Sequence, residues 1–498
     1  MTTSLNRRQV IGIGAALALP VPKGHTRVQD VRSFGAKGDG VTIDSAAIDR
    51  AIQAAAGGGT VYFPPGTYAS YSIHLQSGVT LHLSKGARLL AAKPTATEGY
   101  DPAEPGAGNP YQDYGHSHWH NSLIWGENLT DVVIRGPGVI DGSGLVTGGS
   151  RESAPLQGNK AISLKWCRRV TIRDLTMVNG GHFAILPTGV DDFVLDNLTI
   201  DTNRDGIDID CCRNVRITRC VVNSPADDAI VLKSSYALNQ ARLTENVVVA
   251  NCRVSGYDLG TLIDGTKKIG PYGRTGRVKL GTESNGGFRN VLIQDIAFEY
   301  CRGLALETVD GGVLSGVTAR RLTMHQPQMP FFLRLGARMR GPAGVPVGRL
   351  RDVSISDVVA YDADPRYPST IAGILGHPVE NVRISRVRHE LLGGLTPADA
   401  VADPPELETA YPEPSMFGTL PAFGFFVRHA EDIEIDDVQV AFDHQDTRPA
   451  IVLRDVRGAR FERDRISKVT GVPSYVLDDV DDFTLGRTHY DHVTHLEL

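Results

Sequence analysis

Three aspartates, Asp205, Asp227 and Asp228, are the residues of this sequence best suited to chemistry, because they recur at the spacing of a repeat. Asp205 and Asp227 lie 22 residues apart, and the phrase that begins at Phe193 recurs 22 residues later at Val215. If one repeat forms one coil of a parallel solenoid, Asp205 and Asp227 stack on neighbouring coils about 4.8 Å apart, with Asp228 beside them. Crowded carboxylates repel each other, which costs stability and raises the pKa of at least one of them. Folding alone does not require such a cluster, so the spacing indicates a functional site.

Clustered carboxylates serve more than one kind of chemistry. Glycoside hydrolysis needs a protonated carboxylic acid at the leaving oxygen and a carboxylate that activates water, and inverting enzymes hold the two about 6.5–9.5 Å apart. Carboxylates on two adjacent coils can span that range. Three hard oxygen ligands also suit a calcium ion, and a row of solvated aspartates would need no ligand. Spacing alone leaves all three interpretations open.

The elements that must position the aspartates are short strands of one repeating type. A phrase of Asn or Asp, Val, any residue, Ile or Leu, any residue, Asn or Asp and an apolar residue recurs along the chain, with the alternation of a strand. The phrase starts around Val79, Val132, Val170, Phe193, Val215, Val247, Val291, Val317, Val353, Val382, Ile433, Ala459 and Phe483.

The spacing of the phrase is irregular, from 22 to over 50 residues, so loops must be inserted between coils. The longest are expected at 95–122, 235–246, 256–289, 361–377 and 389–425. We therefore expect one solenoid domain over residues 26–498, right-handed by the usual crossover rule, with loops that build a cleft along one side.

One helix is expected near the start of the solenoid. Apolar residues recur at helical spacing from Ser45 to Ala55, after an N-cap candidate at Asp44 or Ser45 and before the glycines at 57–59. A short helix here would cover the open edge of the first coil, where a solenoid needs a cap.

Charge, hydropathy and cysteine spacing exclude several classes of function. The formal net charge of −6 excludes a strong non-specific affinity for nucleic acid, and no window is apolar for long enough to span a membrane. The six cysteines match no zinc or haem signature, and Cys220 and Cys252 hold the same position in successive repeats, as in an inward-facing packing ladder. We expect a monomer with no cofactor and no bound metal.

The N-terminal segment is typical of an export signal. Arg7 and Arg8 precede a short apolar run at 11–19 that ends at Pro20. This is the layout of a secretory signal, and paired arginines favour the twin-arginine route. We expect residues 1–25 to be such a signal and the protein to be periplasmic or secreted.

Two motifs resemble those of the pectin-degrading hydrolases of glycoside hydrolase family 28, namely Asn203-Arg204-Asp205-Gly206-Ile207-Asp208 and Asp227-Asp228-Ala229-Ile230. With residues 29–70 and the repeat phrase, the resemblance spans almost the whole mature chain. It implies an all-β fold, a single-stranded right-handed parallel β-helix, and a pectic carbohydrate substrate. It also implies that Asp227 is the general acid, while Asp205 and Asp228 position and deprotonate water. Because the motifs and the coil spacing agree, the catalytic interpretation is favoured over a calcium site.

The chain departs from that family at two other motifs. Where the family has Gly-His-Gly, the sequence reads Arg274-Thr275-Gly276-Arg277, and where it has Arg-Ile-Lys, the sequence reads Ala305-Leu306-Glu307. In the family, that Arg and Lys hold the uronate carboxylate beside the scissile bond, so Glu307 reverses the charge there. We expect poor activity on unsubstituted homogalacturonan, unless Lys279 or Arg277 supplies the missing cation.

Further candidates for contact with substrate are Asn203, His182, Lys233, Lys279, Glu283 and Glu307. His182 lies one coil before Asp205, although a buried, hydrogen-bonded histidine would give the same pattern. The lysines can supply cations or remain solvated, and the glutamates can bind sugar hydroxyls, or Glu307 can neutralise Lys279.

Four other features have weaker interpretations. Asp208 and Asp210 are expected in a supporting shell or at the surface. The alternating histidines at 116, 118 and 120 can hold a metal, but a rim position is favoured, with Trp119 as an aromatic platform for sugar. The basic residues at 334–340 can bind carboxylates or decorate a loop.

Three functions compete on these grounds. The leading hypothesis is an exported inverting glycoside hydrolase that cleaves a pectic glycan of galacturonate or rhamnogalacturonan type, and acts from chain ends because the large loops close the groove into a pocket. The second is a polysaccharide lyase on the same fold, which would need calcium and a strong base. The third is a non-catalytic carbohydrate-binding solenoid, which would not need the three aspartates.

Overall fold

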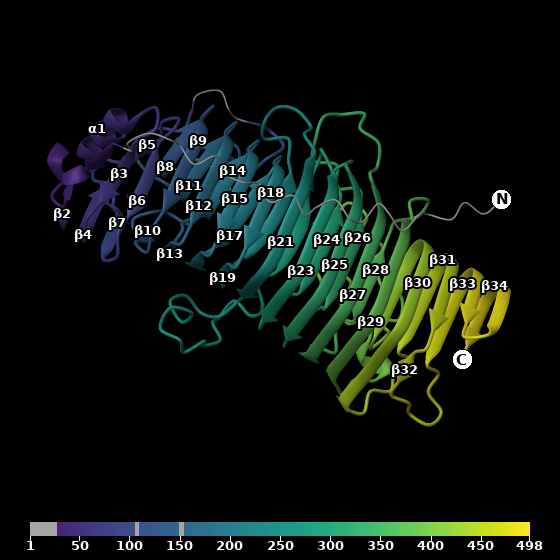
Figure 1. Ribbon diagram of the computed structural model, residues 1–498. Helices are drawn as coiled ribbons and strands as arrows, with labels where there is room; N and C mark the ends of the chain where they lie inside the picture. The colour runs from purple at the N-terminus through teal and green to yellow at the C-terminus, as the bar shows by residue number, and fades with distance from the viewer. Residues whose placement is uncertain (1–26, 105–108, 149–153) are drawn as a thin grey trace.

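The computed structural model describes residues 27–104, 109–148 and 154–498. Its strands wind in successive coils along one axis, from α1 (Ser45–Ala55) at one end to β34 (Thr488–Glu497) at the other (Figure 1). Parallel pairs join each coil to the next, so the fold is the predicted parallel β-helix. The expected export signal, residues 1–25, lies outside the described residues.

The strands form three columns, and each column is a ladder of parallel strands from successive coils. The first column, here called the site column, comprises β5 (Ile73–His74), β8 (Ser122–Glu127), β11 (Lys160–Lys165), β14 (Phe183–Thr188), β17 (Asp205–Asp210), β20 (Ile230–Ser234), β22 (Val278–Ser284), β24 (Leu304–Thr308), β26 (Phe331–Leu335) and β28 (Ser369–Ala372). The second comprises β1 (Val28–Asp30), β3 (Thr60–Phe63), β6 (Thr80–Leu83), β9 (Thr130–Arg135), β12 (Arg168–Arg173), β15 (Asp191–Asp196) and β18 (Arg213–Thr218). The third comprises β2 (Asp39–Ile43), β4 (Gly66–Ser70), β7 (Ala87–Ala91), β10 (Val139–Asp141), β13 (Thr176–Val178), β16 (Thr199–Asp201) and β19 (Val221–Asn223).

Toward the C-terminus, single long strands continue through more than one column. They are β21 (Thr244–Ser255), β23 (Phe288–Glu299), β25 (Val313–His325), β27 (Arg349–Ala363), β29 (Val379–Gly393), β30 (Phe425–His444), β31 (Ile451–Glu462) and β33 (Tyr475–Leu485), with the short β32 (Arg465–Ile466) beside β30. The short 3-10 helices are η1 (Val31–Phe34), η2 (Tyr114–His116) and η3 (Pro397–Asp399).

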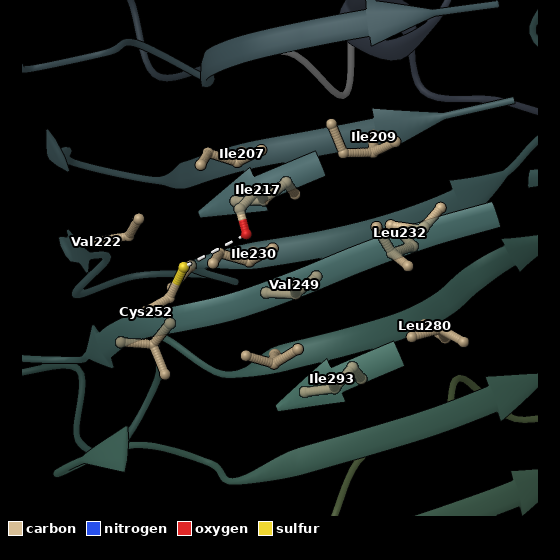
Figure 2. Packing of buried hydrophobic residues seen from close by; sticks show 14 of the residues in the cluster. Ile207, Ile209, Ile217, Val222, Ile230, Leu232, Val249, Cys252, Leu280 and Ile293 are labelled. Atoms are coloured by element: carbon tan, nitrogen blue, oxygen red, sulfur yellow. Dashed lines mark hydrogen bonds between the residues drawn. The ribbon is translucent and has the colours of Figure 1, made fainter. Parts of the chain in front are cut away.

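The core consists of matching rows of apolar side chains, one from each coil. Ile207 pairs with Ile230, and Ile217 pairs with Val249. Figure 2 shows these side chains layered from coil to coil, with Cys252 among them. Each fully buried side chain of this size stabilises the fold by about 1.5–3 kcal/mol. The six cysteines are buried and unpaired, which confirms the packing interpretation.

The Asn and Asp residues of the repeat phrase occupy one bend of every coil. Asp192, Asn214, Asn246 and Asn290 have φ between 55° and 57°, a left-handed conformation that Asn and Asp tolerate best among residues with a Cβ. Their side chains join into a ladder, because Asn214 donates to Asp192 at 3.0 Å and Asn290 donates to Asn246 at 2.7 Å. The polar residues of the phrase therefore turn the chain and bind the coils together.

Both ends of the described solenoid are covered. The buried face of α1, which includes Ile48 and Ile52, packs on the first coil and confirms the predicted cap. At the other end, β34 pairs antiparallel with β33, so the last parallel edge is not left open. Among the described residues, no helix is both long enough and apolar enough to cross a membrane.

Candidate active site

The acidic cluster forms where the chain enters the site column. Asp205 is the first residue of β17, and Asp227 and Asp228 lie in the turn just before β20. Each of the three carboxylates offers an oxygen atom, and these atoms lie within 4.8 Å of one another. The residues that the sequence singled out therefore meet in space.

The register of the cluster differs from the prediction by one residue. Strands β16 and β19 pair at an interval of 22 residues, but β17 and β20 pair at Ile207 and Ile230, an interval of 23. Asp205 consequently lies opposite Asp228, and Asp227 projects from the turn beside them. The prediction that Asp205 stacks on Asp227 is wrong, because the segment from Asn223 to Ile230 is one residue longer than the segment from Asp201 to Ile207 with which it pairs.

Gly206 allows the two coils to approach at this point. Its N–H donates to the Asp228 carbonyl oxygen at 3.0 Å. A Cβ at Gly206 would lie 2.5 Å from the carbonyl oxygen of Ala229, which is closer than real contacts permit. Any larger residue would therefore separate the coils that carry Asp205 and Asp228.

Two buried cations hold Asp228 in its ionised form. Arg277 Nε donates to Asp228 Oδ1 at 2.5 Å, and Lys279 Nζ lies 3.4 Å from Asp228 Oδ2. Burial alone would raise the pKa of Asp228, but the charges of Arg277, Lys279 and Arg302 outweigh it and hold that pKa well below its usual range. Asp228 therefore stays ionised to a lower pH than an ordinary aspartate.

Asp205 has the opposite character. It is 3% exposed, and its burial, reinforced by the negative charge of Asp227, raises its pKa well above the usual value. A proton shared within the cluster therefore resides on Asp205 in the free protein. Two carboxyl groups with opposite protonation preferences are the arrangement that acid–base catalysis requires.

Asp227 is the most accessible of the three acids, with a side chain that is 25% exposed. Arg204 donates to its Oδ2 from Nε at 3.0 Å and from Nη2 at 2.9 Å. Arg204 also contacts His182, through Nη1 and Nε2 at 3.1 Å. Arg204, the middle residue of the motif Asn203-Arg204-Asp205, is thus a cation bound to Asp227, the expected general acid.

His182 and Asn203 support this turn. His182 is buried, and its Nδ1 lies 2.8 Å from the carbonyl oxygen of Thr147. Burial, with the charge of Arg204, lowers the pKa of His182 well below its ordinary value, so the ring is neutral. Asn203 Oδ1 accepts from the N–H of Gly181 at 3.0 Å. The structure therefore places both residues behind the acids, as links between turns.

Lys233 lies at the centre of a second buried network, one step along the site column. Its Nζ lies 2.9 Å from Asp208 and 3.5 Å from Glu283. Asp208 and Asp210 are fully buried, which excludes a surface position for either. His116 Nε2 lies 3.4 Å from Asp210. These residues form a supporting shell, as expected for Asp208 and Asp210, rather than an open wall of the cleft.

Glu307 neutralises the cations beside Asp228. Its carboxylate lies 3.6 Å from Lys279 Nζ and 3.8 Å from Arg277 Nη1, and all three side chains are buried. Lys279 and Arg277 are thus the cations that Asp228 and Glu307 share. The interpretation that Glu307 is a counter-ion of Lys279 agrees with these distances.

Three residues near the acids carried no signal in the sequence: Arg302, Tyr411 and Glu413. Glu413 pairs with Arg302 at 3.2 Å and with Arg277 at 3.5 Å. The ring of Tyr411, which is 49% exposed, lies over Lys279 with its centroid 5.3 Å from Nζ. Tyr411 and Glu413 come from the loop at 389–425, so the length of this predicted insertion was the only sign of their presence.

The loop at 389–425 is fastened to the site column by buried arginines. Arg334 donates to the carbonyl oxygens of Gly373 at 2.8 Å and Glu406 at 2.9 Å. Arg428 donates to the carbonyl oxygen of Pro404 at 2.7 Å. Arg334 of the predicted basic cluster is therefore a structural anchor for this loop.

The predicted aromatic platform at Trp119 is wrong. Trp119 is 2% exposed, and its Nε1 donates to Thr188 Oγ1 at 3.0 Å. Its ring belongs to a small buried cluster with Phe183 and Leu186. Trp119 thus anchors its loop to the site column and offers no surface to a sugar.

The acidic cluster fits a divalent cation less well than it fits acid–base chemistry. Asp205, Asp227 and Asp228 bring oxygen atoms close enough to share an ion. However, Arg277 and Lys279 already occupy Asp228, and Arg204 occupies Asp227. A calcium site needs uncompensated oxygen ligands, whereas each of these two carboxylates has a built-in positive partner.

The three carboxylates are close enough to share one water molecule. Their nearest oxygens lie within 4.8 Å of one another. A water molecule can bridge oxygens at this distance, since a hydrogen bond between oxygens spans about 2.7–2.8 Å. The cluster can therefore hold a water between two carboxylates.

Comparison with known proteins agrees with this geometry. Residues 28–262 match a family described as rhamnogalacturonase A/epimerase, pectate lyase-like. The chain is 27% identical over 383 residues to a probable polygalacturonase of Vitis vinifera, with 71% of this chain and 72% of that protein aligned.

Two solved structures share the fold over almost the whole chain. The family 28 exopolygalacturonase of Yersinia enterocolitica matches with a TM-score of 0.63 at 16% identity, over 93% of this chain and 79% of that one. An exopolygalacturonase of Thermotoga maritima matches with a TM-score of 0.56 at 16% identity, over 96% and 95%. At this identity the likeness is one of fold.

Proposed function

This chain is a glycoside hydrolase family 28-like parallel β-helix protein, and from that premise we propose that it hydrolyses glycosidic bonds of a pectic glycan. The observation that carries the proposal is the acidic cluster itself, in which Asp205 favours its protonated form while Asp228 is held ionised. Glycoside hydrolysis needs one carboxyl group of each kind. The relatives named as polygalacturonases support the choice of a pectic substrate.

The three aspartates have separate roles in the proposed reaction. Asp227, the most accessible acid, passes to the leaving oxygen the proton that Asp205 holds in the free protein. Asp228 and Asp205 bind the attacking water, and a carboxylate of this pair takes up its proton as the new bond forms. Proton transfer from a positioned acid contributes about 10²–10⁴-fold to the rate.

We infer that the reaction inverts the anomeric centre. A nucleophilic carboxylate must present a free lone pair to the sugar, but Asp228 accepts from Arg277 at 2.5 Å and faces Lys279 at 3.4 Å. Charge-assisted hydrogen bonds of this kind lower the nucleophilicity of a carboxylate while they orient it. Water held by Asp228 is the better nucleophile.

Two loops support an action on chain ends. The loop at 389–425 brings Tyr411 and Glu413 to the C-terminal side of the acids. On the N-terminal side, Asn109 donates to Asn239 at 3.1 Å, and Trp119 packs against Phe183, so this loop is also held to the column. A glycan would therefore reach the acids between these two loops. A site closed on two sides accepts the end of a chain more readily than the middle of a polymer.

The test is a reducing-sugar assay of the purified protein on a panel of galacturonate and rhamnogalacturonan oligosaccharides, with and without EDTA. We expect new reducing ends in both conditions, release of one sugar or a short unit from the chain end, and an inverted anomer in the first product by NMR. Ultraviolet absorbance from an unsaturated product would instead identify a lyase. Binding without turnover of any glycan would identify a carbohydrate-binding solenoid.

We also propose that the protein works outside the cytoplasm as a monomer. The paired residues Arg7 and Arg8 before an apolar run support export. Size-exclusion chromatography with light scattering tests the monomer.

A further inference from the structure

Arg204 stands at the centre of the acidic cluster, although no part of the proposed reaction uses it. It occupies the position between Asn203 and Asp205 in the first motif. Its side chain is 31% exposed, so solvent and substrate can reach it. A guanidinium is always charged at physiological pH, so this residue changes the electrostatics of the motif as well as its shape.

The contacts of Arg204 are directed at one oxygen atom. Nε and Nη2 both donate to Asp227 Oδ2, at 3.0 and 2.9 Å, while Nε lies 3.8 Å from Asp205 Oδ2. On its other side, Nη1 lies 3.1 Å from His182 Nε2. The ring of His182 is in turn fixed by Thr147, at 2.8 Å from Nδ1. Arg204 is thus held from behind and aimed at Asp227.

Charged groups from several elements surround the Asp205–Asp227 pair. The negative charges of Asp227 and Asp208 raise the pKa of Asp205, and the positive charges of Lys233 and Arg204 oppose them. Asp228 lies next to Asp227 and is itself neutralised by Arg277, Lys279 and Arg302. His182 is neutral, and Asp113 faces Arg204 from the N-terminal loop. Arg204 is therefore the cation that bonds directly to Asp227.

We propose that Arg204 is a positioning residue that holds the Asp227 carboxylate ionised in the free protein, keeps the shared proton on Asp205, and thereby sets the upper pH limit of hydrolysis. The proposal rests on the proposed function. The proton needed by the leaving group resides on the Asp205–Asp227 pair, and hydrolysis stops at the pH where the pair loses it. A cation beside a carboxylate favours that loss, so Arg204 brings the limit to a lower pH.

The experiment compares the pH dependence of kcat/KM for the unaltered protein, Arg204→Gln and Arg204→Lys. Removal of the charge in Arg204→Gln should move the alkaline limb upward by about one pH unit or more, since an adjacent arginine lowers a carboxyl pKa by about 1–3 units and this one is partly solvated. Arg204→Lys keeps the charge, so its alkaline limb should stay close to that of the unaltered protein. Arg169→Gln removes an exposed arginine that pairs with Asp131 at 2.7 Å, and it should leave the profile unchanged.

An alkaline limb that stays in place in Arg204→Gln, with kcat lowered equally at all pH values, would mean that Arg204 has a structural role only and would overturn the proposal. If Arg204→Gln does not fold in a thermal unfolding assay, His182→Gln provides the second test. This variant keeps the Arg204 guanidinium but removes the imidazole that contacts it. We expect the alkaline limb of the kcat/KM profile to move upward by less than in Arg204→Gln. Absence of hydrolysis by the unaltered protein would instead contradict the proposed function, and this would be found before any variant is compared.

Discussion

At the scale of single residues, Asp227 meets two opposing requirements. As the general acid it must carry a proton when the glycosidic bond breaks, yet Arg204 stabilises its ionised form at 2.9 Å. Asp205 resolves the conflict, because its burial and the charge of Asp227 favour a proton there.

The first prediction concerns this pair. Asp227→Asn keeps the shape of the side chain but removes the proton donor, so kcat should fall by about 10²–10⁴. Asp205→Asn and Asp228→Asn should cause similar losses because the water is then not activated. KM should change little, and the losses should not add, since groups that act as one unit are strongly non-additive.

Steady-state kinetics of the single and double variants measure these losses. Asp131→Asn serves as the control, because its carboxylate lies in an exposed ion pair with Arg169. Multiplicative losses in the double variants would show that the aspartates act independently and would reject the shared mechanism.

The second prediction concerns Lys160, a fully buried lysine of β11. Its Nζ donates to Asn121 Oδ1 at 3.2 Å and to Asn159 Oδ1 at 2.5 Å. Burial lowers its pKa to about 7, against about 10.4 in an unfolded chain. Between these values the unfolded chain binds a proton that the native state does not, so the free energy of unfolding rises with pH.

Lys160→Met removes this pH dependence. The free energy of unfolding of the unaltered protein, minus that of the variant, should increase by about 1.4 kcal/mol per pH unit from about pH 7 to pH 10. Below pH 7 the difference should be constant. Urea unfolding at several pH values measures it, and a difference that is flat from pH 7 to pH 10 would show that Lys160 keeps its charge when buried.

At the scale of elements, the loop at 389–425 brings residues from a distant part of the chain beside the acids. Glu406 lies 3.0 Å from Arg428 and 3.1 Å from His429, and the carbonyl oxygens of Pro405 and Leu407 on either side of it accept from buried arginines. These contacts hold in place a long loop that contains no strand among the described residues between β29 and β30. The loop then presents the half-exposed ring of Tyr411 beside the acids.

The third prediction is that Tyr411→Ala weakens substrate binding without a loss of chemistry. An aromatic contact contributes about 0.5–1.5 kcal/mol, so KM should rise by about two- to tenfold while kcat changes little. Tyr411→Phe keeps the ring and serves as the matched control. A fall in kcat with unchanged KM would place Tyr411 in the chemical step, through the charge of Lys279 beneath it.

At the scale of the whole molecule, the solenoid is a rigid support for a site made on several coils. Asp205, Asp228 and Arg277 come from successive coils of the site column, and the parallel ladders fix their spacing. Each coil is stabilised by its neighbours, so the stability of such a fold is close to a sum of neighbour contacts.

The fourth prediction concerns the delivery of the folded protein. Replacement of both Arg7 and Arg8 by Lys should trap the precursor in the cytoplasm, because the twin-arginine route depends on the paired arginines. Immunoblots of cell fractions measure this. Normal export of the double variant would assign the protein to another route.

The sequence by itself determined the coil, the core and the identity of the acids. The repeat phrase predicted the strands, and its Asn and Asp residues at the bends, such as Asn214 and Asn246, follow from local backbone conformation. Helix α1 has its predicted bounds for the same reason. Local interactions between residues close in the chain are what a sequence pattern records.

Only the tertiary structure decided the electrostatics of the site. One extra residue in the segment from Asn223 to Ile230 placed Asp205 opposite Asp228, a shift that no periodicity could show. Arg277, which holds Asp228 ionised, lies 49 residues after it in the chain. Glu413, which pairs with Arg277, lies a further 136 residues on. Burial of Trp119 also depended on a strand 69 residues later. Charge and burial are properties of what surrounds a side chain, and here the surroundings come from distant coils and inserted loops.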